Sequence, residues 1–518
     1  MSNSFLLIRT LIIYGICLPL AVIVGYMLAT PDDSASLLLV VIVFSLLTIP
    51  LFLRWHHQWL IAAWNMSAVV FFLPGSPSIG LTICFVSLLL SLLQHTLNKN
   101  VKFVYVPTLA WPLAFLAVVV LATAKLTGGI GLQIAGSSSY GGKRYILVLG
   151  AILGYFAITA HRIPPHRVAW AVRLFFASSM IGIVANLLFA IFPTAFFLFK
   201  IFPVDAIAMM AVDRDAADAG GGSLRLGGLA MSGATLFSIL LAIYGIKGIF
   251  SVRHLWRFLL FALCLVVSLF GGFRSILIGL MITFALVFWL EGLMRNRMVP
   301  VLVLMFVMGA AVLAPFTDKL PLSVQRTLCF IPMLPVDPIA ANEAQGSTEW
   351  RLEMWKAVLP EVPKYLILGK GYSFDPNYMR MLQQGLNKGA ETAEGSILAG
   401  DYHNGPLSVI MPFGIFGAIA FLWFMVAGTK VLHYHYKFGD PAYKCINTFL
   451  LAQFVGKCIM FFTVIGSLYS DMAIFTGLVA LSVCINGPIR ASSPAPMPTM
   501  VFNRFKLAHA NAQTSPPQ

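Results

Sequence analysis

The sequence predicts an all-α, polytopic membrane protein, and three observations support that fold class. Of the 518 residues, 59% are hydrophobic and only 10% are charged, whereas soluble domains carry about 25% charged residues. The mean hydropathy is +0.88. Apolar runs of roughly 20 residues, the length that crosses a bilayer as a helix, recur along almost the whole chain.

About fourteen transmembrane helices are expected, within a range of twelve to fourteen. Their ranges in chain order are 8–29, 36–53, 58–74, 78–95, 103–124, 145–160, 168–192, 228–246, 256–271, 274–292, 299–316, 404–428, 446–466 and 470–487. The first run is too long for a signal peptide, and no clear cleavage site follows it, so it counts as a span. Two of the pairs, 256–271 with 274–292 and 446–466 with 470–487, are expected to be tight hairpins.

The distribution of lysine and arginine orients these helices. With the N-terminus inside, the basic loops all face the cytoplasm, namely 54–58, 98–102, 161–167, 247–257, 295–297 and 429–444, as does the basic tail. The short opposite loops at 30–36, 73–78 and 467–471 contain no lysine or arginine. The positive-inside rule therefore predicts that both termini are cytoplasmic. It also explains much of the net charge of +15, so no nucleic-acid partner is expected.

Four regions follow from this pattern. They are N-terminal transmembrane helices over 1–220, a central region over 221–430, C-terminal helices over 431–487, and a cytoplasmic tail over 488–518 that we expect to be disordered. Three long loops lie on the predicted outer face, at 125–144, 193–227 and 317–402, and the last is expected to be partly helical. Because long loops are often functional, the site is expected on that face.

Four basic residues are predicted to converge there. Arg225 ends the second long loop, Arg274 lies at a hairpin tip, Arg351 lies inside the third loop, and His403 opens the span that follows. Arginine presents a planar fork of donors that matches phosphate oxygens, and histidine can accept a proton near neutral pH. The set predicts group transfer from a lipid diphosphate to a hydroxyl, with the arginines stabilising the leaving diphosphate.

Each of these residues taken alone also has a structural interpretation. Arg274 could snorkel to the interface. Arg351 could be a solvated helix charge, or it could form a cation–π pair with Trp355 four residues on. His403 could simply cap a helix. The functional interpretation depends on three arginines and a histidine sharing one side of the bundle.

Some further polar residues call for an interpretation. Asp471, at the last outer turn, could position an acceptor or pair with an arginine. Lys457 falls within a predicted span, so it must be paired or face a polar cavity. Asp213 and Asp215 mimic a DxD metal motif, but they lie in an Ala/Gly-rich stretch, so no metal role is expected there.

The order of four short motifs resembles the O-antigen ligase/O-antigen polymerase superfamily of bacterial membrane glycosyltransferases. The motifs are R-L-x-G, R-x-x-x-W, G-x-G-x-x-F and H-N, matched here by Arg225 to Gly228, Arg351 with Trp355, Gly369, Gly371 and Phe374, and His403 with Asn404. The resemblance covers roughly residues 220–420. Arg274 departs from the family pattern, because it follows Phe273 rather than the serine that the family carries.

The resemblance implies a substrate and a mechanism. The donor would be a glycan on undecaprenyl diphosphate, held by Arg225, Arg351 and Arg274. The acceptor would be a sugar hydroxyl of lipid A–core or of a growing polymer, activated by His403. The reaction would need neither metal nor cofactor, would invert the anomeric centre, and would take place at the bacterial inner membrane. Polymerase and ligase both remain open.

A polysaccharide or lipid-linked oligosaccharide transporter, or flippase, is the alternative from another class. Transporters bind their substrates near the bilayer midplane, and Lys457 is the residue that best fits such a position. The other candidates cluster on one face of the bundle, which favours the enzyme.

Overall fold

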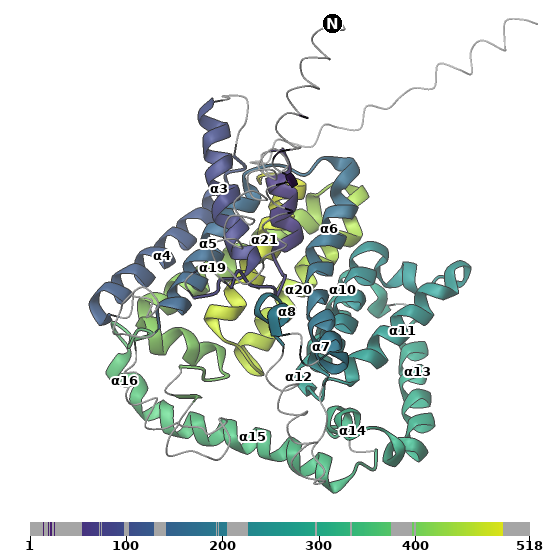
Figure 1. Cartoon of the computed structure of the whole chain (residues 1–518). Coiled ribbons are helices and arrows are strands. Elements are labelled where there is room, and N and C mark those ends of the chain that lie inside the picture. Colours follow the sequence, from purple (N-terminus) through teal and green to yellow (C-terminus); the bar gives the residue numbers. More distant parts are fainter. Residues whose placement is uncertain are drawn as a thin grey trace, which may run out of the picture.

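The structure of the chain, a computed structural model, is a helical bundle (Figure 1). It describes residues 54–71, 73, 75–97, 103–128, 141–192, 194, 196–204, 226–295, 298–331, 334–373, 396–397 and 400–489, together with positions 14, 19, 21, 22 and 25. Helices make up 81% of it. The β-structure among these residues is one isolated bridge between Val69 and Ser78.

Ten of the described helices are long and apolar enough to cross a membrane, which confirms the predicted fold class. They are α3 (Ile79–Leu97), α4 (Pro107–Thr127), α5 (Gly142–Thr159), the span Pro165–Phe189 containing α6 (Val168–Ala177), α10 (Gly227–Ile249), the span Val252–Leu269 containing α11 (Leu255–Leu269), the span Leu302–Lys319 overlapping α13 (Met298–Leu313), α19 (Gly405–Phe438), the span Pro441–Thr463 containing α20 (Lys444–Thr463), and α21 (Leu468–Asn486). The helix α12 (Arg274–Leu290) is shorter. Both predicted hairpins, α11 with α12 and α20 with α21, are present.

The count of fourteen spans stays a prediction. The expected span 36–53 lies outside the described residues, as does most of 8–29 and most of the tail 488–518. The expected span 58–74 is wrong as a continuous helix, because the helix there ends at residue 63. Other segments of the protein provide hydrogen-bond partners for the irregular backbone that follows. The Val69 amide donates to the Ile201 carbonyl (2.8 Å), as non-helical backbone at membrane depth requires.

The centre of the bundle is α21, packed along α5. In its apolar window 78% of the residues are buried inside the protein, against 22% for the span that contains α11 and 6% for the span Leu302–Lys319, which overlaps α13. The polar residues Asp471, Thr476 and Ser482 of α21 are buried, and polar side chains in a membrane helix face other helices rather than lipid. The paired helices α5 and α21 run through the middle of the bundle from one end to the other.

The predicted loop 317–402 contains α14 (Leu322–Leu328), α15 (Pro338–Val358) and α16 (Val362–Tyr365). The helix α15 lies across one end of the bundle (Figure 1). It starts after Asp337, whose side chain accepts from the Ile339 amide (2.7 Å), with a proline at the first position. Both features favour a helix start. The loop is therefore partly helical, as expected.

The long helix α19 contains a break that the loop fills. Gly414, two residues after Pro412, has φ +61° and interrupts the helix. The interruption frees carbonyls on its N-terminal side. The Met411 carbonyl accepts from the Lys370 amide (2.7 Å), and the Pro412 carbonyl accepts from the Gly371 amide (3.0 Å). A segment of the loop 317–402 therefore completes the hydrogen bonding of a helix long and apolar enough to cross a membrane.

Candidate active site at the α15 end of the bundle

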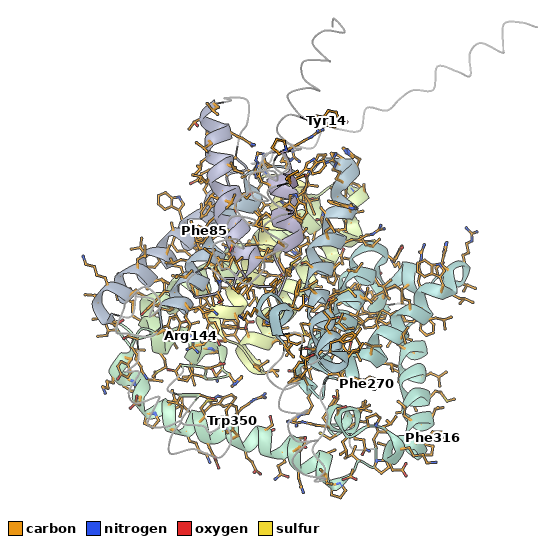
Figure 2. The ribbon with its side chains drawn as sticks, viewed as in Figure 1. Tyr14, Phe85, Arg144, Phe270, Phe316 and Trp350 are labelled. Carbon is orange, nitrogen blue, oxygen red and sulfur yellow. The ribbon has the colours of Figure 1, made fainter. Side chains whose placement is uncertain are left out.

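Of the four basic residues predicted to converge, the structure describes three, and all three belong to elements at the α15 end. Arg274 is the first residue of α12, Arg351 lies within α15, and His403 comes two residues before the first residue of α19. Trp350 and Arg144 mark this region (Figure 2). We define the site as His403 and the described side chains that surround it.

His403 is held by both its backbone and its ring. Its φ is +45°, a left-handed conformation that is uncommon for a residue other than glycine and that is often found at functional sites. Its ring lies edge-on to Trp350 with centroids 5.2 Å apart. The next residue, Asn404, caps α19, its side chain accepting from the Leu407 amide at 3.1 Å. His403 is therefore fixed between α15 and the start of α19.

Trp355 anchors the same turn from the other side. Its indole Nε1 donates to the Tyr402 carbonyl (2.8 Å), which ties the residue before His403 to α15. The structural alternative of a cation–π pair with Arg351 is wrong, since no such contact occurs between these two described side chains. The R-x-x-x-W spacing instead places an arginine and an anchoring indole one helical turn apart.

Arg351 is a partly buried cation without a counter-ion among the described residues. Its Nε is buried and has no hydrogen-bond partner there. Burial lowers the pKa of its guanidinium, and the positive charges of Arg274 and Arg326 lower it further. Arg326 is neutralised by Glu343 (2.7 Å), whereas Arg351 is not. An anion bound at Arg351 would offset both the desolvation cost of the buried guanidinium and its repulsion by the neighbouring arginines.

Part of the Arg274 guanidinium is used to connect the start of α12 to α15. Its Nη2 donates to the Ala344 carbonyl (2.6 Å) and to Thr348 Oγ1 (3.1 Å), both on α15. The alternative of a side chain that merely snorkels is therefore wrong, because the guanidinium bonds to protein. It ties the start of α12 to α15 close enough to Arg351 for the two charges to repel.

Three predicted features lie outside the described residues, namely Arg225, the pair Asp213 and Asp215, and Phe374 of the G-x-G-x-x-F motif. The residue after Arg225 is described. The Leu226 amide donates to the Phe270 carbonyl (3.1 Å) in the hairpin that carries Arg274. The start of α10 therefore adjoins that hairpin.

Asp471 pairs with a lysine rather than an arginine. Its Oδ1 lies 2.9 Å from Lys457 Nζ on α20, and its Oδ2 accepts from the Ser467 amide (3.0 Å) at the start of α21. Of the two alternatives expected for Lys457, a pair or a polar cavity, the structure shows the pair. Both carboxylate oxygens of Asp471 are thus occupied by partners within the protein.

A cluster around Arg144, which the sequence analysis missed, adjoins His403. The Arg144 guanidinium lies 4.5 Å from the ring centroid of Tyr469 and 5.7 Å from that of Tyr372. The Tyr469 hydroxyl donates to Asp401 Oδ2 (3.3 Å). Asp401 is two residues before His403 in the D-Y-H-N stretch. The signal was present in the sequence, since Arg144 and the lysine before it are basic residues on the predicted outer side, against the positive-inside bias.

Three buried polar atoms near His403 lack a partner within the described chain. They are Trp350 Nε1, Arg351 Nε and Asp401 Oδ1. An unsatisfied buried polar group costs about 1–3 kcal/mol, and such groups are rare in native proteins. Two donors and one acceptor beside a histidine form a set that a polar ligand would satisfy.

The G-x-G motif positions the loop that closes the site. Gly369 and Gly371 have φ of +76° and +71°, and a Cβ at either would overlap neighbouring atoms, at the Pro412 carbonyl and at Thr127 respectively. The next amide, of Tyr372, donates to the Tyr145 hydroxyl (2.8 Å). Only glycine permits the backbone to pass this close to α19 and α4.

The comparisons with known proteins agree with this geometry. Residues 259–422 match a family model described as O-antigen ligase. That range includes Arg274, Arg351 and His403, whereas Asp471 lies beyond it. No curated protein matches the chain. The O-antigen ligase match over residues 259–422 supports the O-antigen ligase/polymerase superfamily, and the ten described helices long and apolar enough to cross a membrane are consistent with a multi-pass membrane protein.

Proposed function

We propose that this chain transfers a glycan from undecaprenyl diphosphate to a sugar hydroxyl at the outer face of the bacterial inner membrane. It acts as a polymerase of O-antigen or exopolysaccharide units, or as an O-antigen ligase. The observation that carries the proposal is Arg351, a partly buried guanidinium with no counter-ion among the described residues. It lies on the helix whose Trp350 contacts His403.

The arginines hold the donor diphosphate. Arg351 supplies the unpaired charge, and Arg274 adds the donors that α15 does not use. Arg225 belongs to the R-L-x-G motif and is proposed as a third diphosphate ligand on the strength of that motif, since it lies outside the described residues and before the matched range 259–422. Guanidinium forks match phosphate oxygens in pairs, and they stabilise the charge that develops on the leaving diphosphate. The positive charge comes from side chains, so the reaction is metal-independent and uses no cofactor.

His403 accepts the proton of the acceptor. The acceptor hydroxyl oxygen forms a bond to the anomeric carbon while the bond from that carbon to the diphosphate oxygen breaks. The hydroxyl proton passes to His403, and undecaprenyl diphosphate leaves. A single displacement of this kind inverts the anomeric centre. A positioned base of this kind contributes about 10²–10⁴-fold to the rate.

The acceptor sugar is positioned by the cluster around Arg144. Asp401 Oδ1 is a buried acceptor without a partner among the described side chains, suited to a sugar hydroxyl. Burial raises the pKa of Tyr402 to about 12 and also raises that of Tyr372, so both phenols keep their protons near neutral pH. Asn404 contributes by fixing the start of α19 rather than by contacting substrate.

The main observation in favour of a transporter was the position of Lys457, and the structure explains that residue in another way. Lys457 was the residue that best fitted a binding site at the midplane. In the structure it pairs with Asp471, in the first turn of α21 and near the α15 end. The remaining candidate residues lie on the same side of the bundle, which supports chemistry at a boundary rather than passage through the middle.

A test in cells compares His403→Ala with His433→Ala. His433 is an exposed histidine near the other end of α19 and serves as the matched control. With both variants present at normal membrane levels, His403→Ala should lower polymer or ligated product by about 10²-fold or more. Lipid-linked intermediate should accumulate on the outer side, whereas His433→Ala should behave like the unmodified protein.

Two results would contradict the proposal. Unchanged polymer in His403→Ala would remove His403 from the mechanism. Intermediate trapped on the cytoplasmic side would show that the protein moves lipid-linked glycan rather than transferring it.

A further inference from the structure

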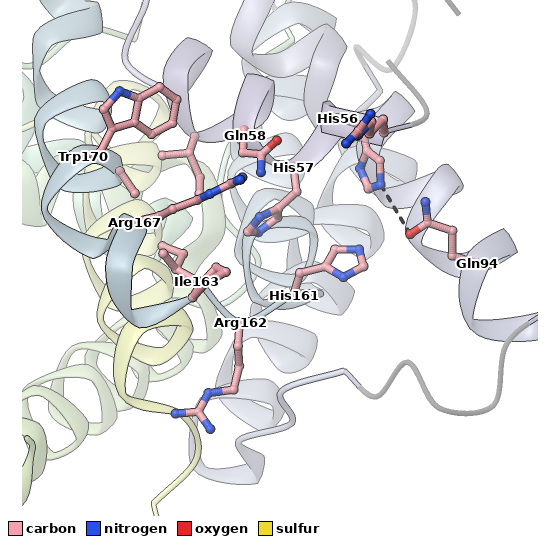
Figure 3. Close-up of a pocket in the computed structure, with 13 residues that line it drawn as sticks. His56, His57, Gln58, Gln94, His161, Arg162, Ile163, Arg167 and Trp170 are labelled. Atoms are coloured by element: carbon pink, nitrogen blue, oxygen red, sulfur yellow. Dashed lines mark hydrogen bonds between the residues drawn. The ribbon is translucent and has the colours of Figure 1, made fainter. Parts of the chain in front are cut away.

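A pocket of about 230 Å³ lies at the end of the bundle opposite to His403 (Figure 3). It forms where the helical segment 54–63, the end of α3, the turn after α5 and the start of α6 meet. The helix α5 begins two residues before Arg144 and ends two residues before His161, so its length separates the two regions by about 25 Å. The positive-inside rule predicts that this end faces the cytoplasm.

The pocket is lined by three arginines and no acid. Arg54, Arg162 and Arg167 contribute to its wall, and none of the lining residues is aspartate or glutamate. The described ion pairs are made by other residues. Three uncompensated guanidinium groups around one cavity create a positive potential that favours an anion.

The arginines keep donors available for a ligand. Arg162 uses Nη2 to bond the Asn486 carbonyl (3.3 Å), and Arg167 uses Nε to bond His166 Nε2 (3.2 Å). Each guanidinium has five N–H donors, so most of them remain available. Figure 3 shows Arg167 beside His57, with Arg162 extending from the turn that carries His161.

Three histidines form the inner wall and add hydrogen-bonding groups rather than charge. The His161 ring lies edge-on to those of His56 and His57, with centroids 5.4 and 5.3 Å away. Burial lowers the pKa of all three, that of His57 to about 4. They are therefore neutral near pH 7. His56 and His57 are held by Gln94 (3.4 Å) and by the Ile158 carbonyl (2.7 Å).

Exposed tryptophans place this pocket at a membrane–water boundary. Trp55, Trp59 and Trp170 are 42%, 48% and 52% exposed, and Trp170 lines the pocket itself. Tryptophan is enriched at the level of lipid headgroups. On α3, Leu89 and Leu93 are exposed at 59% and 49%, which provides an apolar surface beside Gln94 for acyl chains.

We propose that this pocket binds the phosphate group of an anionic membrane lipid. The arginine forks bind the phosphate oxygens, the histidines form the neutral inner wall beside them, and the acyl chains lie along the exposed face of α3. Basic pockets between transmembrane helices on the cytoplasmic side are suited to such headgroups. A soluble phosphate compound has the same chemistry at its phosphate but would make no use of the tryptophans or the apolar face.

The test measures lipid binding to the purified full-length protein by native mass spectrometry. Phosphatidylglycerol and phosphatidylcholine are titrated against the unmodified protein, against Arg54→Gln/Arg167→Gln, and against Arg253→Gln. Arg253 is an exposed arginine on the same predicted side and outside the pocket. Phosphatidylglycerol should bind the unmodified protein more tightly. The double variant should lose about tenfold or more in affinity, and Arg253→Gln should lose none.

A second arm distinguishes the source of the phosphate. Inorganic pyrophosphate is added to the protein in nanodiscs of phosphatidylcholine alone, and thermal unfolding is followed. Little change in melting temperature is expected. Tight pyrophosphate binding without a preference for phosphatidylglycerol would overturn the lipid assignment in favour of a soluble ligand. Equal phosphatidylglycerol binding by the unmodified protein and the double variant would overturn the site itself. The comparison of the two lipids on the unmodified protein tests the proposal even if the variant misfolds.

Discussion

At the scale of single residues, the ion pair of Lys457 and Asp471 joins α20 to the first turn of α21. Removing one partner leaves an uncompensated, largely buried charge, which typically costs about 3–5 kcal/mol. Because the Lys457 side chain is 23% exposed, we expect about 2–4 kcal/mol here for Lys457→Met or for Asp471→Asn. The double variant should recover most of that loss. Thermal unfolding in detergent measures all three.

Activity separates this role from a catalytic one. If the pair only holds α20 against α21, the double variant should also recover transfer activity. An inactive double variant with restored stability would instead show that Asp471 acts on the acceptor, which is the first of the two alternatives that the sequence leaves open.

The sequence predicts single site residues where a motif marks them. His403, Arg351 and Trp355 occur at recognisable spacings, and Lys457 is conspicuous as a charge inside an apolar run. Arg144 lies 257 residues before Asp401 in the sequence, and the two come together because Tyr469 of α21, which packs along α5, contacts both. The hydrogen bonds from Arg274 to α15 could not be predicted from the sequence either, because they depend on where α15 lies in the fold.

At the scale of elements, the glycine motif and the broken helix α19 act as one unit. Gly371→Ala places a Cβ against Thr127 and Tyr145 at a φ of +71°. The segment must then withdraw, and the Pro412 carbonyl loses its donor. Together, the backbone strain and the lost hydrogen bond should cost about 2–4 kcal/mol and lower transfer activity, measured by thermal unfolding and product formation.

Gly346→Ala is the matched control. Gly346 lies within α15, and a Cβ there meets nothing within 4 Å. Alanine in a helix interior is favoured over glycine by about 0.5–1 kcal/mol, so this variant should be slightly more stable than the unmodified protein. If both variants behaved alike, the close approach at Gly371 would not matter.

Hydrophobic length predicts most elements, and it misleads where the chain bends inside the protein. The α11–α12 and α20–α21 hairpins follow from two apolar runs around a short turn. The run 58–74 is just as apolar, yet its helix ends at residue 63, because contacts to distant segments satisfy the backbone that follows. Length and composition do not reveal that another part of the chain will supply hydrogen bonds.

At the scale of the whole molecule, sidedness remains a prediction from the positions of basic loops. In a cysteine-free background, Glu349→Cys on α15 and Lys437→Cys at the far end of α19 place exposed thiols at opposite ends. A membrane-impermeant maleimide should label Glu349→Cys in intact spheroplasts, and it should label Lys437→Cys only after permeabilisation. The reverse pattern would put His403 in the cytoplasm and contradict the proposed site.

The sequence predicts the class of this molecule and the end that holds its site, but not the arrangement of its helices. Apolar runs predict that helices cross the membrane, but they do not predict which helices pack against one another. The central position of α21 could not be predicted because most of the spans are apolar. Buried area and interlocking side chains decide that order, and those properties belong to the assembled fold.

The break in α19 has a consequence for how the protein is made. In the bilayer, the freed Met411 and Pro412 carbonyls need donors, which Lys370 and Gly371 supply. These two residues precede α19 in the chain, so they emerge from the ribosome first. On the predicted topology they have already crossed the membrane when α19 is inserted. The order of synthesis thus delivers the donors before the acceptors need them, and a circular permutation that reversed this order should insert poorly.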